Sequence, residues 1–210
     1  MQRLPAAVSQ QPEFTTAASL LVGRRYGPTV STWALNQSDG ELRVHTGVSG
    51  RAAKMGHRLT IAVASWRATV SWSGKLPSAV TLTADAASLQ VVAGEGGLTP
   101  LSAAEKHLAT GNALKCLGAK TFPEIQFESE NVAKTDDGYR LSGAVEIHGV
   151  RRHQIIDVAV ADLGGSWCMS AEVAVRQSVF GVKPYSMLMG SMKVTDEVTV
   201  SFRATWRKDG

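Results

Sequence analysis

Residues 155–175, IIDVAVADLGGSWCMSAEVAV, place apolar side chains at every second position on both sides of a glycine pair. The residues that share one face are Ile156, Val158 and Val160 before the pair and Trp167, Met169, Ala171, Val173 and Val175 after it. Side chains of a β-strand alternate between two faces, so this period of two indicates two strands with one apolar face each. Leu163-Gly164-Gly165-Ser166 between them is typical of a tight turn. The stretch therefore predicts an antiparallel hairpin.

The same alternation continues on both sides of this hairpin, from Trp33 to Trp206. The further segments with apolar residues at every second position are 41–48, 57–63, 68–72, 80–82, 89–91, 125–127, 141–147 and 198–206. Turn-forming residues separate them, as in Asp136-Asp137-Gly138, which is typical of a hairpin. The pattern predicts about eight to ten strands.

One segment, residues 100–118, breaks the period of two. The apolar residues there with the spacing of a helix face are Leu101, Ala104 and Leu108. Proline is favoured at the start of a helix and glycine near its end, so Pro100 marks the beginning and Gly111 ends or divides the segment. We expect one or two short helices there, with no β-α-β alternation around them.

This pattern of elements predicts an all-β fold, an antiparallel barrel or sandwich with short helices around residues 100–118. A sheet of this size has exposed edges unless it closes on itself, and this favours a single antiparallel barrel. A barrel of about eight strands is either filled by its own side chains or holds one slender ligand. The sequence leaves these two alternatives open.

Composition narrows the class of protein further. The 210 residues are 44% hydrophobic and 19% charged, which excludes a mainly disordered chain. Polar residues interrupt every apolar run, so we expect no stable membrane insertion. The net charge of +4 is too small to indicate a nucleic-acid-binding protein. Cys116 and Cys168 lack the spacing of a metal or redox motif and are predicted to be reduced packing residues.

The chain divides into an arm and one domain. Residues 1–28 are rich in Gln, Ser, Thr and Pro and lack the long apolar core of a secretory signal. They predict a flexible N-terminal arm, and residues 29–210 a single domain. The chain as given predicts a cytoplasmic location, with a removed leader left open. Pairing of two barrels as a homodimer is also left open.

The sequence offers few candidates for chemistry. The histidines lack the HxH and HExxH spacings of metal ligands, and no G-x-S-x-G or P-loop motif is present. His107 lies on the expected helix, and His148 precedes a basic turn at Arg151 and Arg152. The charged side chains of such a turn are explained by exposure to solvent. The alternative is that Arg151, Arg152 or Arg176 binds a phosphate group of a ligand. We predict no catalytic residue, no metal and no cofactor.

The second half of the chain resembles the YceI-like family. The segments that carry the resemblance are Lys106-His107-Leu108, residues 121–129 (TFPEIQFES), residues 141–150 (LSGAVEIHGV) and residues 194–198 (VTDEV). In order and spacing they are similar to the family patterns HL…yPxIxFxS, GxLxIxGV and vgDeV. The match extends over about residues 105–206. Before it, the resemblance is limited to Trp33, the Ser38-Asp39-Gly40 turn and Gly56-His57.

The resemblance implies an up-and-down, lipocalin-like barrel that holds a long isoprenoid molecule, a polyisoprenoid or an isoprenoid quinone, and does not transform it. Each buried CH₂ group stabilises such a complex by about 0.8 kcal/mol, and flexible Met side chains suit methyl-branched shapes. The ligand contacts predicted on this basis are Phe127, Val145, Ile147, Trp167, Met169, Val173, Phe180, Tyr185, Met187, Met189, His107 and Arg176.

Two departures from the family concern the mouth of the barrel. Residues 176–181, RQSVFG, have one residue more than the family's R-x-D-F-G and lack its Asp. Residues 149–153, GVRRH, add charge where the family's GVTxPv has Pro. These departures leave the ligand's head group open. Two alternative functions also stand: an enzyme on this scaffold with His107 or His148 as base, and a ligand-free interaction module with a filled barrel.

Overall fold

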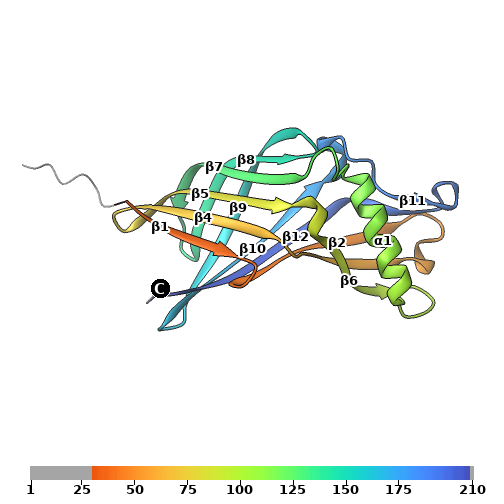
Figure 1. Cartoon of the computed structure of the whole chain (residues 1–210), viewed down its shortest axis with the longest axis horizontal. Helices are drawn as coiled ribbons and strands as arrows, with labels where there is room; N and C mark the ends of the chain where they lie inside the picture. The colour runs from red at the N-terminus through yellow and green to blue at the C-terminus, as the bar shows by residue number, and fades with distance from the viewer. Residues whose placement is uncertain (1–29, 209–210) are drawn as a thin grey trace, which may run out of the picture.

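Strands dominate the computed structural model, which describes residues 30–208 (Figure 1). The strands in this range are β1 (Val30–Asn36), β2 (Gly40–Ser49), β3 (His57–Val63), β4 (Trp66–Ser73), β5 (Leu76–Asp85), β6 (Leu89–Gly96), β7 (Glu124–Lys134), β8 (Gly138–Ile147), β9 (Val150–Asp162), β10 (Ser166–Arg176), β11 (Ser186–Met187) and β12 (Met192–Arg207). The helical elements are α1 (Ala103–Cys116) and the 3-10 turns η1 (Ala53–Met55), η2 (Ala86–Ser88), η3 (Gln177–Phe180) and η4 (Leu188–Gly190). The predicted arm over residues 1–28 lies outside the described residues.

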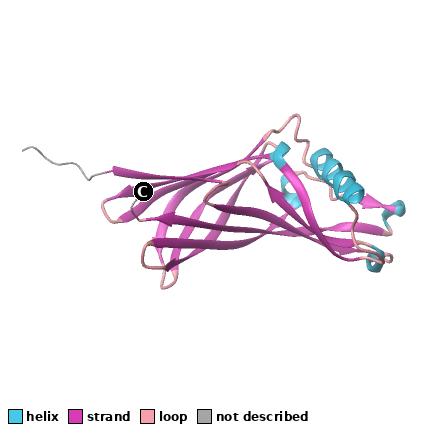
Figure 2. Cartoon of the chain, turned by 60° about the horizontal axis from the view of Figure 1, so that its bottom comes forward, coloured by secondary structure: helices cyan, strands magenta, loops and turns pink. Residues whose placement is uncertain are grey.

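The strands form one antiparallel sheet that curls around a common interior (Figure 2). β5, β7, β8, β9, β10 and β12 pair in this order, and β12 pairs with β2 on its other side. β2 pairs with β3, which continues through Ala64 and Ser65 into β4, and β4 pairs with β5. The pairings thus return to their starting point, and the predicted single antiparallel barrel is confirmed.

Bends in three long runs of chain explain why the described residues contain twelve strands rather than eight to ten. β1 with β2, β3 with β4, and β5 with β6 each form one bent run along the barrel. Hydrogen bonds from Ala64 N to Ser88 O, 3.2 Å, and from Asp85 N to Ser65 O, 2.9 Å, carry the pairing across one bend. With β11 set aside and each run counted once, eight passes of chain remain in up-and-down order.

The helix α1 lies at one end of the barrel, beside β6 (Figure 1). Its start is set by a capping box: the Ser102 hydroxyl accepts a hydrogen bond from Glu105 N, and the Glu105 carboxylate accepts one from Ser102 N at 2.8 Å. The expectation that Gly111 ends or divides the helix is wrong, because α1 runs through it unbroken. A glycine inside a helix costs only about 1 kcal/mol relative to Ala, which the other residues of α1 offset.

The buried side chains lie on the inner face of the barrel in two clusters. One surrounds Trp66 and Ala204, and the other surrounds Phe127 and Phe180. Many inward apolar residues, such as Val200 and Phe202, are only partly buried although they pack against these clusters. Inward side chains that remain partly accessible show that the clusters do not fill the barrel.

Candidate binding site: an apolar cavity

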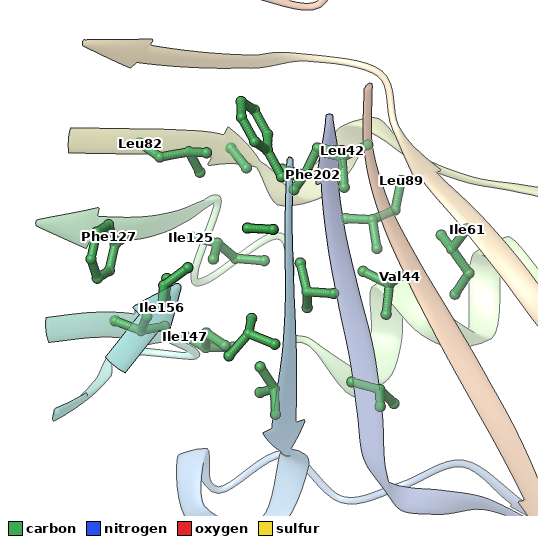
Figure 3. Close-up of a pocket in the computed structure, with 18 of the residues that line it drawn as sticks. Leu42, Val44, Ile61, Leu82, Leu89, Ile125, Phe127, Ile147, Ile156 and Phe202 are labelled. Carbon is green, nitrogen blue, oxygen red and sulfur yellow. The ribbon is translucent and has the colours of Figure 1, made fainter. Parts of the chain in front are cut away.

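The interior of the barrel contains a cavity of about 1010 Å³. Ten of its lining residues are labelled in Figure 3, all of them aliphatic or aromatic: Leu42, Val44, Ile61, Leu82, Leu89, Ile125, Phe127, Ile147, Ile156 and Phe202. They come from strands all around the barrel, and their side chains converge on the same space. This volume lies at the upper end of the roughly 300–1,000 Å³ range of small-molecule pockets. The open form of the barrel, one of the two alternatives left by the sequence, is therefore the one observed.

The period of two in the sequence accounts for the apolar wall. On β10 the residues that line the cavity are Trp167, Met169, Ala171, Val173 and Val175, and their neighbours between them are absent from the lining. On β12 the lining residues Val198, Val200 and Phe202 repeat this spacing. Because a strand sends successive side chains to opposite faces, one apolar set per strand is enough to build the wall.

Four tryptophans gather at one end of the barrel, which we call the tryptophan end. Trp33 lies 4.5 Å from Trp72 and 5.1 Å from Trp206, measured between ring centroids, and it is stacked on Trp206 with an interplanar angle of 11°. The cross-strand partner of Trp206 is Trp167, and the Nζ atom of Lys208 lies 4.1 Å from the centroid of the Trp167 ring. Aromatic rings from β1, β4, β10 and β12 thus gather at this end, and those of Trp33, Trp72 and Trp167 line the cavity.

The opposite end, which we call the helix end, is bounded by α1 and the loops beside it. The residues of α1 in the cavity wall are Glu105, Leu108, Ala109, Asn112, Ala113 and Cys116, which share one face at helical spacing, and Leu101 lines the cavity just before the helix. None of the residues Ala103–Cys116 is buried, because this face borders open space. Met55 and Met187 line the cavity here and are exposed, so the cavity reaches the surface at the helix end.

Nine of the twelve residues predicted to contact a ligand lie in the cavity wall. They are Phe127, Val145, Ile147, Trp167, Met169, Val173, Phe180, Tyr185 and Met187. The other three lie elsewhere. His107 is exposed and outside the lining face of α1, Met189 projects fully into solvent, and Arg176 is exposed with its Nε atom 3.6 Å from the Glu197 carboxylate.

Several polar side chains of the cavity wall were missed in the sequence. They include Asn112, Tyr139 and Gln177. Asn112 is four residues after Leu108 and could have been placed on the inward face by the helical period of α1. Tyr139 lies two residues before the inward Leu141 on β8, so the alternation could also have placed it in the wall.

The charged pairs of the barrel lie on its outer side. Arg140 donates two hydrogen bonds to the Asp157 carboxylate, at 2.7 and 2.8 Å, and this contact lowers the pKa of Asp157. Arg151 contacts Glu128 at 3.0 Å, outside the cavity wall. Inside, burial raises the pKa of the Cys116 thiol, which keeps it protonated and uncharged at neutral pH. The interior therefore suits an uncharged, apolar molecule.

The histidines proposed as catalytic bases do not face this interior. His148 packs against the Phe122 ring with 4.4 Å between ring centroids, and neither His148 nor His107 is in the cavity wall. His57 does line the cavity at the helix end, where its Nε2 atom lies 2.9 Å from Thr99 O. Among residues 30–208, no cluster of three or more His, Cys, Asp or Glu side chains has the arrangement of a metal site.

The fold and the cavity define a lipocalin-like barrel with an apolar interior. The model of the YceI-like domain matches residues 33–206, and the chain belongs to this family. The structure is similar to the crystal structure of BcnA from Burkholderia cenocepacia, with a TM-score of 0.61 and 18% sequence identity, covering 81% of this chain and 98% of that one. A YceI protein of Campylobacter jejuni is similar at a TM-score of 0.47 and 12% identity, covering 95% and 99%. No curated protein matches the chain.

Proposed function

We propose that this protein binds a long isoprenoid molecule, a polyisoprenoid or an isoprenoid quinone, in the barrel cavity and stores or carries it without transforming it. The observation that supports this most directly is the apolar cavity of about 1010 Å³ that runs between the tryptophan end and the helix end. Its wall carries mainly branched aliphatic and aromatic side chains. Such a wall excludes water from a hydrocarbon and offers few partners to a charged ligand.

The elongated shape of the barrel favours a chain over a compact ligand. β12 has 16 residues, and at about 3.4 Å per residue a strand of this length extends over up to about 50 Å. Lining residues extend from Met192 at its start to Phe202, which covers about 34 Å of the strand. Because each buried CH₂ group contributes about 0.8 kcal/mol, a chain that follows this wall gains affinity with every isoprene unit.

A binding role without catalysis is supported by where the candidate bases lie. His107 and His148 are outside the wall, so an enzyme on this scaffold would depend on His57 among the described histidines. His57 is held by its contact with Thr99 O at the rim of the cavity. The apolar interior gives a bound hydrocarbon van der Waals contacts along its length, which is what storage or transport needs.

The test is to identify what the protein holds and to block the space that holds it. Native mass spectrometry and solvent extraction of the purified protein are expected to find an isoprenoid lipid. Ala171 lines the cavity on β10, whereas Ala174 on the same strand is exposed and outside the wall. Ala171→Trp fills the space of more than two CH₂ groups and is expected to lower ligand occupancy about tenfold or more. Ala174→Trp is the matched control and should keep the ligand.

Three results would contradict the proposal. Protein that carries no lipid and takes up no added polyprenol has no such binding site. If the extracted lipid has no isoprene units, the cavity is still a binding site but its ligand is not an isoprenoid. Equal occupancy in Ala171→Trp and Ala174→Trp would place the ligand outside the cavity.

The cellular location and the oligomeric state are separate questions. Among the described residues, no helix has both the length and the apolar character that crossing a bilayer requires. A cytoplasmic location stays a prediction, which cell fractionation tests. Light scattering after size-exclusion chromatography measures whether two barrels pair.

A further inference from the structure

Exposed apolar side chains gather around the mouth of the cavity at the helix end. This set, the apolar rim, consists of Met55, Leu98, Leu108, Met187 and Met189. Their exposed fractions run from 42% at Met187 to 101% at Met189. Single exposed apolar residues are normal, but a group of them around one opening marks an interaction surface.

The loops that carry the apolar rim are joined to one another. Ala52 N donates a hydrogen bond to Ser191 O at 2.9 Å, which ties the β2–β3 loop to the segment before β12. The His57 ring contacts Thr99 O at 2.9 Å, which ties the start of β3 to the β6–α1 loop. Figure 1 shows these loops together with β11 at the end of the molecule where α1 lies. The rim is therefore one preformed surface.

Packing within the chain does not explain the rim. Met189, at its tip, has a backbone φ of 54°, a conformation that is uncommon for residues other than Gly, Asn and Asp. Its side chain is fully exposed, so it fills no gap in the core. Met55, Leu108 and Met187 also line the cavity, so the exposed surface continues directly into the cavity wall.

Basic residues outnumber acidic ones around the rim. The segments 50–58, 94–108 and 186–193 contain Arg51, Lys54, Arg58, Lys106 and Lys193 against Glu95 and Glu105. Glu95 lies 3.4 Å from Arg58, and Glu105 accepts hydrogen bonds from Ser102, so both carboxylates have partners. Arg51 and Lys54 are exposed on the loop that carries Met55, and Lys193 is exposed near the start of β12, paired with β11. The rim is thus an apolar surface surrounded by positive charge.

We propose that the apolar rim docks the mouth of the barrel reversibly on an anionic lipid bilayer. Met189 and Leu98 enter the interface between head groups and acyl chains, and Arg51 and Lys54 contact lipid phosphates. Docking in this way joins the bilayer interior to the cavity, so an apolar ligand passes between them without crossing water. This inference rests on the proposed function for the ligand that is exchanged, whereas the docking itself is measured separately.

The test uses the full chain and vesicles of phosphatidylcholine with or without phosphatidylglycerol in a flotation assay. Binding is expected only with phosphatidylglycerol and should weaken as salt is raised, because salt screens exposed charges. The apolar double variant Met189→Ser/Leu98→Ser removes two side chains that lie outside the cavity wall. It should lower vesicle binding about tenfold, and Arg51→Gln/Lys54→Gln about thirtyfold.

The matched control is Leu76→Ser/Leu163→Ser, which removes two similarly exposed leucines at the tryptophan end. This control should bind vesicles like the natural chain, and equal losses in the control and in the rim variants would overturn the proposal. Absence of binding to anionic vesicles would also overturn it. A rim variant that dissolves a dimer while vesicle binding stays unchanged would show instead that the rim is a surface for self-association.

The docking and the ligand are tested independently. Ala171→Trp should bind vesicles normally, because its substitution lies inside the barrel away from the rim. Loss of vesicle binding in a protein that still carries isoprenoid lipid rejects only the docking surface. Normal vesicle binding by a protein that holds no lipid rejects the proposed function and leaves the docking surface in place.

Discussion

The two ends of the barrel are built from different kinds of contact. At the tryptophan end, strands supply aromatic rings that stack on one another, such as Trp33 on Trp206. At the helix end, α1 and three loops surround an opening, and apolar side chains such as Leu108 and Met55 remain exposed. Packed aromatic groups add to the stability of the fold, whereas exposed apolar groups do not. The comparison teaches that aromatic packing is concentrated at one end of the sheet, whereas exposed apolar side chains gather around the cavity at the other.

The largest effect is expected from Trp33→Ala at the tryptophan end. The substitution removes a ring that contacts both Trp72 and Trp206, and it should lower the free energy of unfolding by about 3 kcal/mol. Denaturant unfolding followed by circular dichroism measures the change. Trp33→Phe keeps a ring in place and should lower the free energy of unfolding by only about half as much. A change below about 1 kcal/mol for Trp33→Ala would show that the stack does not stabilise the barrel.

A smaller effect is expected from Ser102→Ala at the start of α1. The substitution removes the hydroxyl that accepts from Glu105 N, and an N-cap serine contributes about 1 kcal/mol. The free energy of unfolding should fall by this amount, while Ser102→Asp, which can still cap the helix, should preserve it. No change with Ser102→Ala would indicate that α1 frays without affecting the sheet.

The pH dependence of stability involves one carboxylate at each end of the barrel. The Lys208 ammonium lowers the pKa of Asp162 at the tryptophan end, and the Ser102 hydroxyl lowers the pKa of Glu105 at the helix end. A carboxylate whose pKa is lowered by folding stabilises the fold at pH values above its pKa in the unfolded chain. This contribution is lost as the pH falls through its lower pKa in the folded protein. The melting temperature should therefore fall between about pH 5 and pH 3. Asp162→Asn should flatten this profile, and an unchanged profile would contradict the ion pair.

The smallest effect on stability is expected from Leu108→Ser at the helix end. Leu108 is 63% exposed, and its loss should change the free energy of unfolding by less than about 0.5 kcal/mol. The same denaturant measurement applies, with Trp33→Ala as the opposite extreme. A loss above about 1.5 kcal/mol would mean that Leu108 packs against the barrel, and the contrast between the two ends would then be weaker than described.

Strand positions could be predicted from the sequence because each strand has its own local period. The inward set on β10, from Trp167 to Val175, was visible as alternation, and the turn at Gly164 and Gly165 joins β9 to β10 as expected. Ser102 and Glu105 also have the S-x-x-E spacing of a capping box, which marks the helix start better than Pro100 does. Local patterns of this kind need only neighbouring residues to be recognised.

Which residues form the cavity wall was harder to predict from the sequence. The helical period places Asn112 on the same face of α1 as Leu108, but a single helix does not reveal that this face borders a cavity rather than a packed sheet. Met189 was expected near the ligand on the strength of its type and neighbours, yet it projects outward at the tip of a loop. Placement of such residues depends on how separate elements dock.

The sequence by itself determined that the chain forms antiparallel strands with one apolar face each, because strand periodicity is a local property of neighbouring residues. Only the tertiary structure decided that the barrel is open inside. That outcome depends on the pairing of β12 with β2, which closes the sheet, and on the combined volume of side chains from eight passes of chain. Neither quantity is local, because each inward residue meets partners that are distant in the sequence.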